Sequence, residues 1–147
     1  MRLSKRCEYG IKASVRLAQV RGTKFTQSRE LAEAELLPAK FLESILLALR
    51  SASLLESKVG AGGGYRLARP ADEVRVVDIV AALDRSEPEV STDFDPRLGS
   101  PRPGQIAVDL IHERIDQAMS DAMSGLMLSD LVAMSDTKAA GYVGVGR

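Results

Sequence analysis

The spacing of apolar residues predicts three helices within the first fifty residues. Residues 3–21 carry apolar side chains at intervals of three and four, and Gly22 follows at a position where helices commonly end. A second helix is predicted to begin at Thr26, a residue type that favours the N-cap. Pro38 suits the first turn of a third helix over 38–50. Its apolar residues repeat at intervals of three and four, and Leu42, Ile45 and Leu49 are expected to face inward. The outward side is then expected to hold Ala39, Lys40 and Glu43, with Ser44 and Leu47 as further candidates.

A β-hairpin is predicted directly after the third helix. Residues 55–59 and 65–68 alternate between apolar and polar side chains, and the run 60–64 between them is rich in glycine. Two helices with a short connection, followed by a hairpin, form the pattern of a winged helix-turn-helix, whose hairpin is the wing. The helix pair alone would also suit an ordinary bundle, but basic residues around the glycine tip favour DNA binding. The run is not a phosphate loop, because Tyr65 and Arg66 stand where Gly-Lys-Ser/Thr would be needed.

The second half of the chain predicts a short helix over 76–83, a loop over 85–104 and a long helix from residue 105. The long helix has an apolar side with nothing to bury it except the body or a second copy, so we expect pairing across a two-fold axis. We expect residues 105–135 to hold this dimerisation helix and a short terminal helix, and 136–147 to be a flexible tail. The predicted dimer contacts are Val108, Ile111, Ile115, Met119, Ala122, Met123 and Leu126.

The net charge of zero hides an asymmetry between the two halves. Residues 1–70 hold thirteen Lys and Arg against six acids, while residues 71–147 hold seven against fourteen. This asymmetry favours a polyanion-binding module in the first half. Aromatic residues make up only 4% of the chain, which disfavours a base-stacking platform for single strands. One cysteine, no apolar run of about 18 residues and no signal sequence together predict a soluble cytoplasmic protein.

Several segments resemble one known family. Met1-Arg2-Leu3-Ser4, Glu30-Leu31-Ala32-Glu33, the recognition-helix run 41–46, the wing run 62–70 and Leu128-Ser129-Asp130-Leu131-Val132 occur in the same order as in the BadM/IscR-type (Rrf-two) winged-helix transcriptional regulators. The glycine-rich wing is the most specific of these segments. The resemblance implies a mainly α fold with a small β-hairpin, in which 1–84 is the winged helix-turn-helix domain. It also implies a homodimer, joined through its long C-terminal helix, on a dyad-symmetric operator of double-stranded DNA.

The resemblance also supplies expectations for individual residues. Lys40, Phe41 and Glu43 occupy the positions at which such proteins read bases, and Val59 stands where the family's wing often has an arginine. Cluster-binding members carry three cysteines in the loop after the short helix, whereas residues 85–104 have none, so we expect no iron–sulphur cluster and no cofactor. The complete set of predicted DNA contacts is Arg2, Lys5, Lys24, Thr26, Gln27, Ser28, Arg29, Ala39, Lys40, Phe41, Glu43, Lys58, Gly62, Gly63, Gly64, Tyr65 and Arg66.

The function that these features favour is a homodimeric DNA-binding repressor without a metal or catalytic site. One alternative is a winged-helix module that binds protein instead of DNA, and another is a cluster- or thiol-sensing regulator of the same family. An enzyme is the weakest alternative, because no carboxylate pair, nucleophile–base set or phosphate loop is visible. The signal could be a small ligand at the loop, a protein effector or thiol chemistry at Cys7, and the sequence leaves these open.

Overall fold

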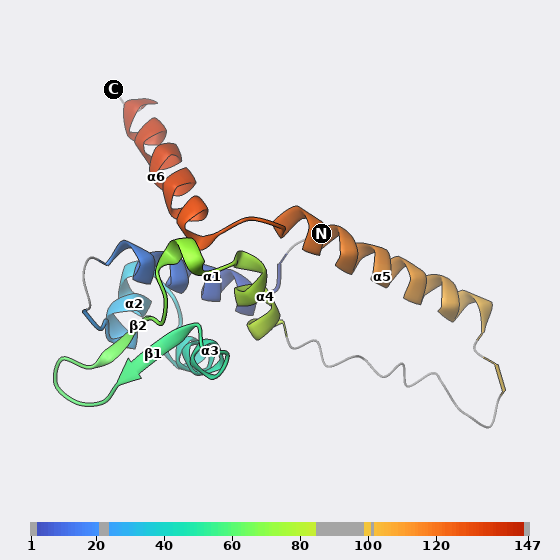
Figure 1. The fold of residues 1–147 in the computed structure, drawn as a ribbon, viewed down its shortest axis with the longest axis horizontal. Helices are drawn as coiled ribbons and strands as arrows, with labels where there is room; N and C mark the ends of the chain where they lie inside the picture. The colour runs from blue at the N-terminus through green and yellow to red at the C-terminus, as the bar shows by residue number, and fades with distance from the viewer. Residues whose placement is uncertain (1–2, 21–23, 85–98, 101, 146–147) are drawn as a thin grey trace. The chain divides into compact units, whose positions relative to one another are not determined.

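The structure is a computed structural model that describes residues 3–20, 24–84, 99–100 and 102–145 (Figure 1). The chain divides into two compact units, of which one comprises Met1–Asp84 with Gly125–Arg147 and the other comprises Arg85–Ser124. None of the described helices is long and apolar enough to cross a membrane. Most of the loop predicted over 85–104 lies outside the described residues.

The first unit has the order of elements that the hydrophobic pattern predicts. The helices α1 (Lys5–Gln19), α2 (Ser28–Glu35) and α3 (Ala39–Ser51) are followed by the strands β1 (Leu55–Lys58) and β2 (Gly64–Leu67). The strands pair antiparallel, from Leu55 opposite Leu67 to Lys58 opposite Gly64. A 3-10 helix, η1 (Ala71–Glu73), leads into α4 (Val76–Leu83), and α6 (Leu128–Val145) completes the unit. The prediction of a mainly α fold with a small hairpin is therefore confirmed.

The prediction that Thr26 caps the second helix was wrong. The N-cap of α2 is Gln27, and Thr26 lies in extended chain that pairs with β2. The Thr26 amide donates to the Tyr65 carbonyl and the Tyr65 amide donates to the Thr26 carbonyl, both at 2.8 Å. Thr26 therefore forms two backbone hydrogen bonds in an extended conformation instead of capping α2 with its side chain. The hairpin is thereby attached to the segment between α1 and α2.

The core of the first unit is built around α3. Leu42, Ile45, Leu46 and Leu49 on this helix are fully buried, as the spacing of three and four predicts. Gly10 of α1 faces α4 so closely that an added Cβ would overlap the Leu83 side chain. Cys7 lies on the same side of α1 and is buried.

The end of the chain differs from the expectation of a short helix and a flexible tail. The helix α6 continues to Val145, and Leu128 at its start is fully buried. The Asp130 carboxylate accepts a hydrogen bond from the Met127 amide at 2.8 Å, and the Gln19 side chain of α1 donates to Asp136 at 3.2 Å. The glycines near the end of α6 cost a helix only about 1 kcal/mol each, which is too little to end it before Val145.

The second unit contains α5 (Pro103–Met123). This helix begins close to the predicted residue 105, but it ends before Leu126, which lies in the first unit. The Leu126 carbonyl accepts a hydrogen bond from the Val76 amide at 3.0 Å, and the Leu128 amide donates to the Val74 carbonyl at 2.8 Å. The connection between α5 and α6 is thus paired with the segment before α4, so Leu126 is not part of the long helix.

Candidate nucleic-acid interface

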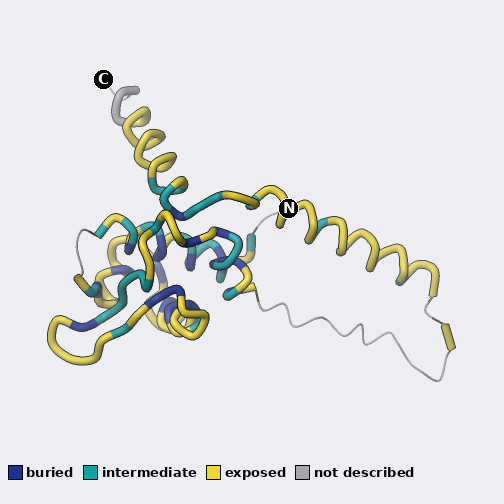
Figure 2. Tube along the Cα trace, in the orientation of Figure 1, coloured by how far each residue is buried: buried dark blue, intermediate teal, exposed yellow. Residues whose placement is uncertain are grey.

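One side of α3 is turned to solvent while the other forms the core (Figure 2). The residues that the sequence placed outward, Ala39, Lys40 and Glu43, are all exposed. Further along the helix, Ser44, Leu47, Arg50 and Ser51 are exposed on the same side. We call these seven exposed residues of α3 the outer stripe: Ala39, Lys40, Glu43, Ser44, Leu47, Arg50 and Ser51. It contains a cation and an anion within its first two turns.

Contacts with α1 fix the beginning of α3. Phe41 is 39% exposed, and its ring meets the Tyr9 ring edge-on, with 5.6 Å between the centroids and 83° between the planes. The Arg6 guanidinium donates to the Ser44 hydroxyl at 3.1 Å, and this hydroxyl donates to the Phe41 carbonyl at 3.0 Å. The sequence did not single out Tyr9 or Arg6, because such contacts between helices have no signature in local spacing.

Two of the predicted wing contacts have a structural role. Gly63 is buried, and a Cβ there would overlap the Lys58 carbonyl. Gly64 has φ +134°, and a Cβ there would overlap the Thr26 carbonyl. These two glycines allow the hairpin to close and to lie against the segment before α2. Val59 and Gly62, by contrast, are exposed at the tip of the wing.

Arg66 is held at the base of the wing. Its guanidinium lies over the Phe25 ring at 4.3 Å from the centroid, and it forms an ion pair with Glu56 at 2.9 Å. Glu56 is directly opposite Arg66 in the strand register. These contacts place the guanidinium on the outer side of the hairpin and restrict its conformations.

The remaining predicted contacts differ in their accessibility. Lys24, Gln27 and Lys58 are exposed, while Ser28 and Tyr65 are half-buried and the whole of Thr26 is only 7% exposed. Lys5 and Arg29 are exposed too, and each forms a surface ion pair, with Glu8 at 3.2 Å and with Glu33 at 3.3 Å respectively. Exposed pairs of this kind contribute at most about 1 kcal/mol, so they can be exchanged for a phosphate. Arg2 lies outside the described residues.

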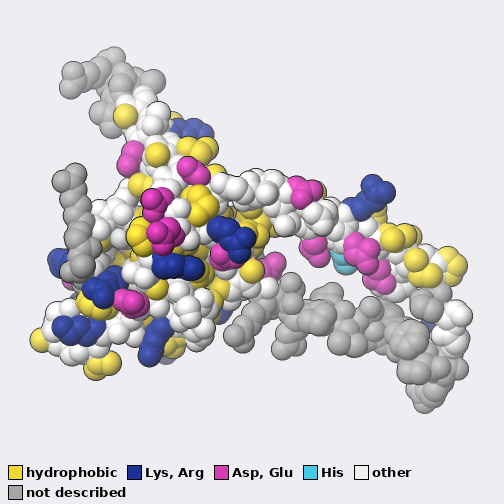
Figure 3. All heavy atoms as spheres, viewed as in Figure 1, with side chains coloured by type: hydrophobic (Ala, Val, Ile, Leu, Met, Phe, Trp, Pro, Cys, Tyr) yellow, Lys and Arg dark blue, Asp and Glu magenta, His cyan; other side chains and the backbone are white. Residues whose placement is uncertain are grey.

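Two hollows flank the hairpin. One, of about 640 Å³, lies between the end of α3 and the strands. Its charged lining residues are the cations Arg50, Lys58 and Arg66 and the acid Glu56, which pairs with Arg66, so cations outnumber acids there. The sequence missed Arg50 because its position at the end of a helix gives no hint that it adjoins the wing. Figure 3 shows Lys and Arg side chains over the winged helix on the face drawn.

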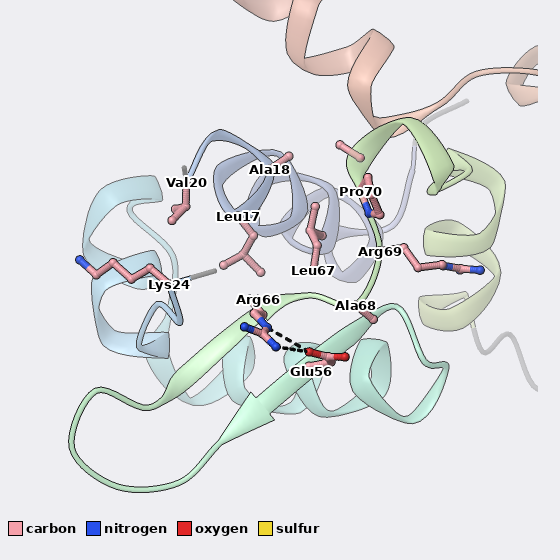
Figure 4. A pocket seen from close by; sticks show the side chains of 11 residues that line it. Leu17, Ala18, Val20, Lys24, Glu56, Arg66, Leu67, Ala68, Arg69 and Pro70 are labelled. Carbon is pink, nitrogen blue, oxygen red and sulfur yellow. Dashed lines mark hydrogen bonds and ion pairs between the residues drawn. The ribbon is translucent and has the colours of Figure 1, made fainter. Parts of the chain in front are cut away.

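The second hollow, of about 410 Å³, lies between the end of α1 and β2 (Figure 4). Its apolar walls include Leu17 and Leu67, and the Glu56–Arg66 ion pair lies at its edge. The side chains of Lys24 and Arg69 extend away from it in opposite directions. Its cations therefore do not converge on a common point, and the hollow is not built as an anion site.

Comparison with known proteins identifies relatives along nearly the whole chain. The model of the Rrf2 family, described as "Iron-dependent Transcriptional regulator", matches residues 3–134. A Mycobacterium tuberculosis relative is 38% identical over 84 residues, which are 57% of this chain and only 52% of the relative. The transcriptional regulator CymR of Bacillus subtilis is 28% identical over 97% of this chain and 98% of its own length. The solved structure of T. potens IscR has a TM-score of 0.69 at 27% identity, covering 92% of this chain and 88% of that one.

The family description mentions iron, so the possible ligands need to be considered. The chain has one cysteine and one histidine, of which Cys7 is buried in α1 and His112 is exposed on α5. Within the described ranges no three potential metal ligands lie together. Residues 85–98 contain neither cysteine nor histidine. These residues do not fit a cysteine-ligated cluster, whose usual ligands are several thiolates.

Proposed function

Because the chain belongs to the Rrf2 family of transcriptional regulators, we propose that it is a sequence-specific DNA-binding regulator. In this proposal it acts in the bacterial cytoplasm as a homodimeric repressor on a dyad-symmetric operator. The observation that carries the proposal is the combination of an outward, polar α3 with a basic hollow between that helix and the wing. A helix with one free side and cations beside it has the dimensions and charge to enter a major groove.

The outer stripe supplies the groups that would face base edges. Lys40, in the first turn of α3, can donate to the acceptors of guanine, and Glu43 can accept from the amino group of cytosine. Ala39 presents a methyl group next to them. The ring contact between Phe41 and Tyr9 supports this arrangement, because it holds the beginning of α3 against α1 and so reduces the ordering required on binding.

Cations around α3 would contact the phosphates on either side of the groove. Arg50 and Lys58 approach from the hollow at the wing, and Lys5, Lys24 and Arg29 are exposed on the segments before α3. The exposed Gly62 lets the tip of the wing approach the backbone closely. Arg66 would act at the base of the wing, where Glu56 and Phe25 position it.

The long helix of the second unit would form the dimer. On α5, Val108 and Ile111 are exposed, and Ile115, Met119 and Met123 are only half-buried, with Ala122 exposed beside them. An apolar side of this length is typical of helices that pair with a second copy. Binding to two half-sites in successive major grooves would require the two α3 helices of the dimer to lie about 34 Å apart, which is one turn of DNA. Occupation of a promoter by this dimer would exclude polymerase and so repress transcription.

We propose further that the protein functions without an iron–sulphur cluster, since the chain has only one cysteine and that residue is buried. The effector that controls DNA binding would then be a small molecule or a protein partner. Burial of Cys7 makes direct thiol chemistry the least favoured of the signals considered.

The proposal is tested by measuring the affinity of the purified protein for its own upstream DNA by fluorescence anisotropy at several salt concentrations. We expect log K to fall with log salt by about 0.9 for each phosphate neutralised. Lys40→Ala should weaken binding by about tenfold, because it removes a charged donor from the groove. The matched control is Lys138→Ala, which removes an exposed lysine from α6 and should leave the affinity unchanged. The proposal would be contradicted if the affinity did not change with salt concentration, or if Lys40→Ala and Lys138→Ala bound the DNA with equal affinity. Either result would favour a protein-binding module.

A further inference from the structure

The large apolar side chains exposed on the winged helix are confined to its proposed DNA-binding elements. Among the described residues of 3–84 they are Leu36 in the helix-turn-helix connection, Phe41 and Leu47 on α3, and Val59 at the wing tip. Phe41 is in contact with Tyr9, which explains its position. Leu47 has no such role, because four other side chains of α3 already fill the core.

Leu47 lies in the middle of the outer stripe. Leu47 is 50% exposed as a residue, whereas Ile45, Leu46 and Leu49 on the same helix are fully buried. Glu43 lies one turn before it and Ser51 one turn after it, and both are exposed. A leucine at this point therefore places an exposed aliphatic surface in the middle of a largely polar stripe. Truncation of the Leu47 side chain should lower the free energy of unfolding only slightly, because Leu47 is already half-exposed to water.

The chemistry of the major groove restricts what an aliphatic side chain can recognise there. Base edges present hydrogen-bond donors and acceptors, and the one apolar group among them is the 5-methyl of thymine. An aliphatic side chain placed against a donor or acceptor would remove water from it without replacing the hydrogen bond. Thymine is therefore the base whose edge complements Leu47.

We propose, on the basis of the DNA-binding function above, that Leu47 is a specificity-determining residue that contacts the 5-methyl group of a thymine in each half of the operator. Four residues of α-helix span about 6 Å, so this thymine lies within about two base pairs of the base that Glu43 contacts. The outer stripe then recognises a polar base edge at one end and an apolar edge at its middle. A regulator with a polar residue at position 47 would not select this thymine.

The test combines a protein variant with a change of one methyl group in the DNA. A preferred sequence is first selected from random DNA by the full-length wild-type protein, and each thymine in it is then replaced singly by deoxyuridine, which lacks only the methyl. We expect one position per half-site at which deoxyuridine weakens wild-type binding about three- to fivefold, the effect of losing one buried methyl group. Leu47→Ala should bind the thymine probe correspondingly more weakly and should not distinguish thymine from deoxyuridine at that position.

Controls separate this outcome from a general loss of structure or of binding. Met134→Ala truncates an apolar side chain of similar exposure on α6, and it should retain the full preference for thymine. Leu47→Met keeps an aliphatic contact and should retain most of the preference. If Leu47→Ala weakened the thymine and deoxyuridine probes equally at every position, the proposal for Leu47 would be overturned while DNA binding itself stood. If the wild-type protein selected no preferred sequence from the random DNA, the proposed sequence-specific DNA-binding function itself would be contradicted.

Discussion

The attachment of the wing to the rest of the protein depends on Gly64, so Gly64→Ala is a sharp test of the structure. A Cβ at this position would overlap both the oxygen and the carbon of the Thr26 carbonyl group. Both atoms belong to the backbone, and they cannot move aside as a flexible side chain would. Relief requires β2 to separate from the segment before α2.

The cost of this separation can be worked out from the contacts. Two backbone hydrogen bonds between Thr26 and Tyr65 would be lost or stretched, each contributing about 0.5–1.5 kcal/mol net. The backbone conformation of Gly64, with φ +134°, adds about 1–3 kcal/mol of strain for any other residue. We expect Gly64→Ala to lower the free energy of unfolding by about 2–6 kcal/mol, a large part of the 5–15 kcal/mol typical of a domain.

The measurement is urea unfolding followed by circular dichroism, with Gly62→Ala as the matched control. Gly62 also has a positive φ, +72°, but nothing lies within 4 Å of a Cβ added there. The free energy of unfolding of Gly62→Ala should therefore fall by only about 1 kcal/mol, from backbone strain alone. Amide exchange at Thr26 and Tyr65 should accelerate in Gly64→Ala and stay slow in Gly62→Ala. If the two variants unfolded at the same urea concentration, the close approach of β2 to Thr26 would be refuted.

Three other changes test separate parts of the structure. Leu36→Gly should raise the free energy of unfolding by about 0.5–1 kcal/mol in urea melts, because Leu36 has φ +54° and is 91% exposed; a loss of stability would contradict the left-handed connection. Gly10→Ala should lower it by about 1–3 kcal/mol, since the new methyl overlaps Leu83, and adding Leu83→Ala should make the two costs non-additive. Ile111→Asp should convert the proposed dimer to a monomer in sedimentation velocity, because it places a charge on the exposed apolar side of α5. A dimer that persisted in this variant would place the interface elsewhere.

The elements of the winged helix could be predicted from the sequence because each has a local signal. The apolar spacing of α3 and the alternation around the glycine run both correspond to elements of the structure. The outward position of Lys40 and Glu43 followed from the same spacing, since residues opposite a buried side must face water. Such signals depend only on helix and strand periodicity.

The features that could not be predicted depend on contacts between segments distant in sequence. Thr26 has the side chain of a helix cap, but the edge of β2 forms backbone hydrogen bonds with it instead. The proximity of Arg50 to the wing requires knowledge of how α3 meets the hairpin. The length of α6 was underestimated because its glycines weaken the helical pattern, while the buried Leu128 and the hydrogen bond from Gln19 to Asp136 are tertiary contacts.

The proposed binding to a two-fold symmetric operator through α3 and the wing can be measured by hydroxyl-radical footprinting of the wild-type protein on its upstream DNA. We predict two protected segments about one helical turn apart, related by a dyad, with the protection lost on Lys40→Ala and retained on Lys138→Ala. Uniform cleavage of the DNA at protein concentrations that support dimer formation would contradict the account.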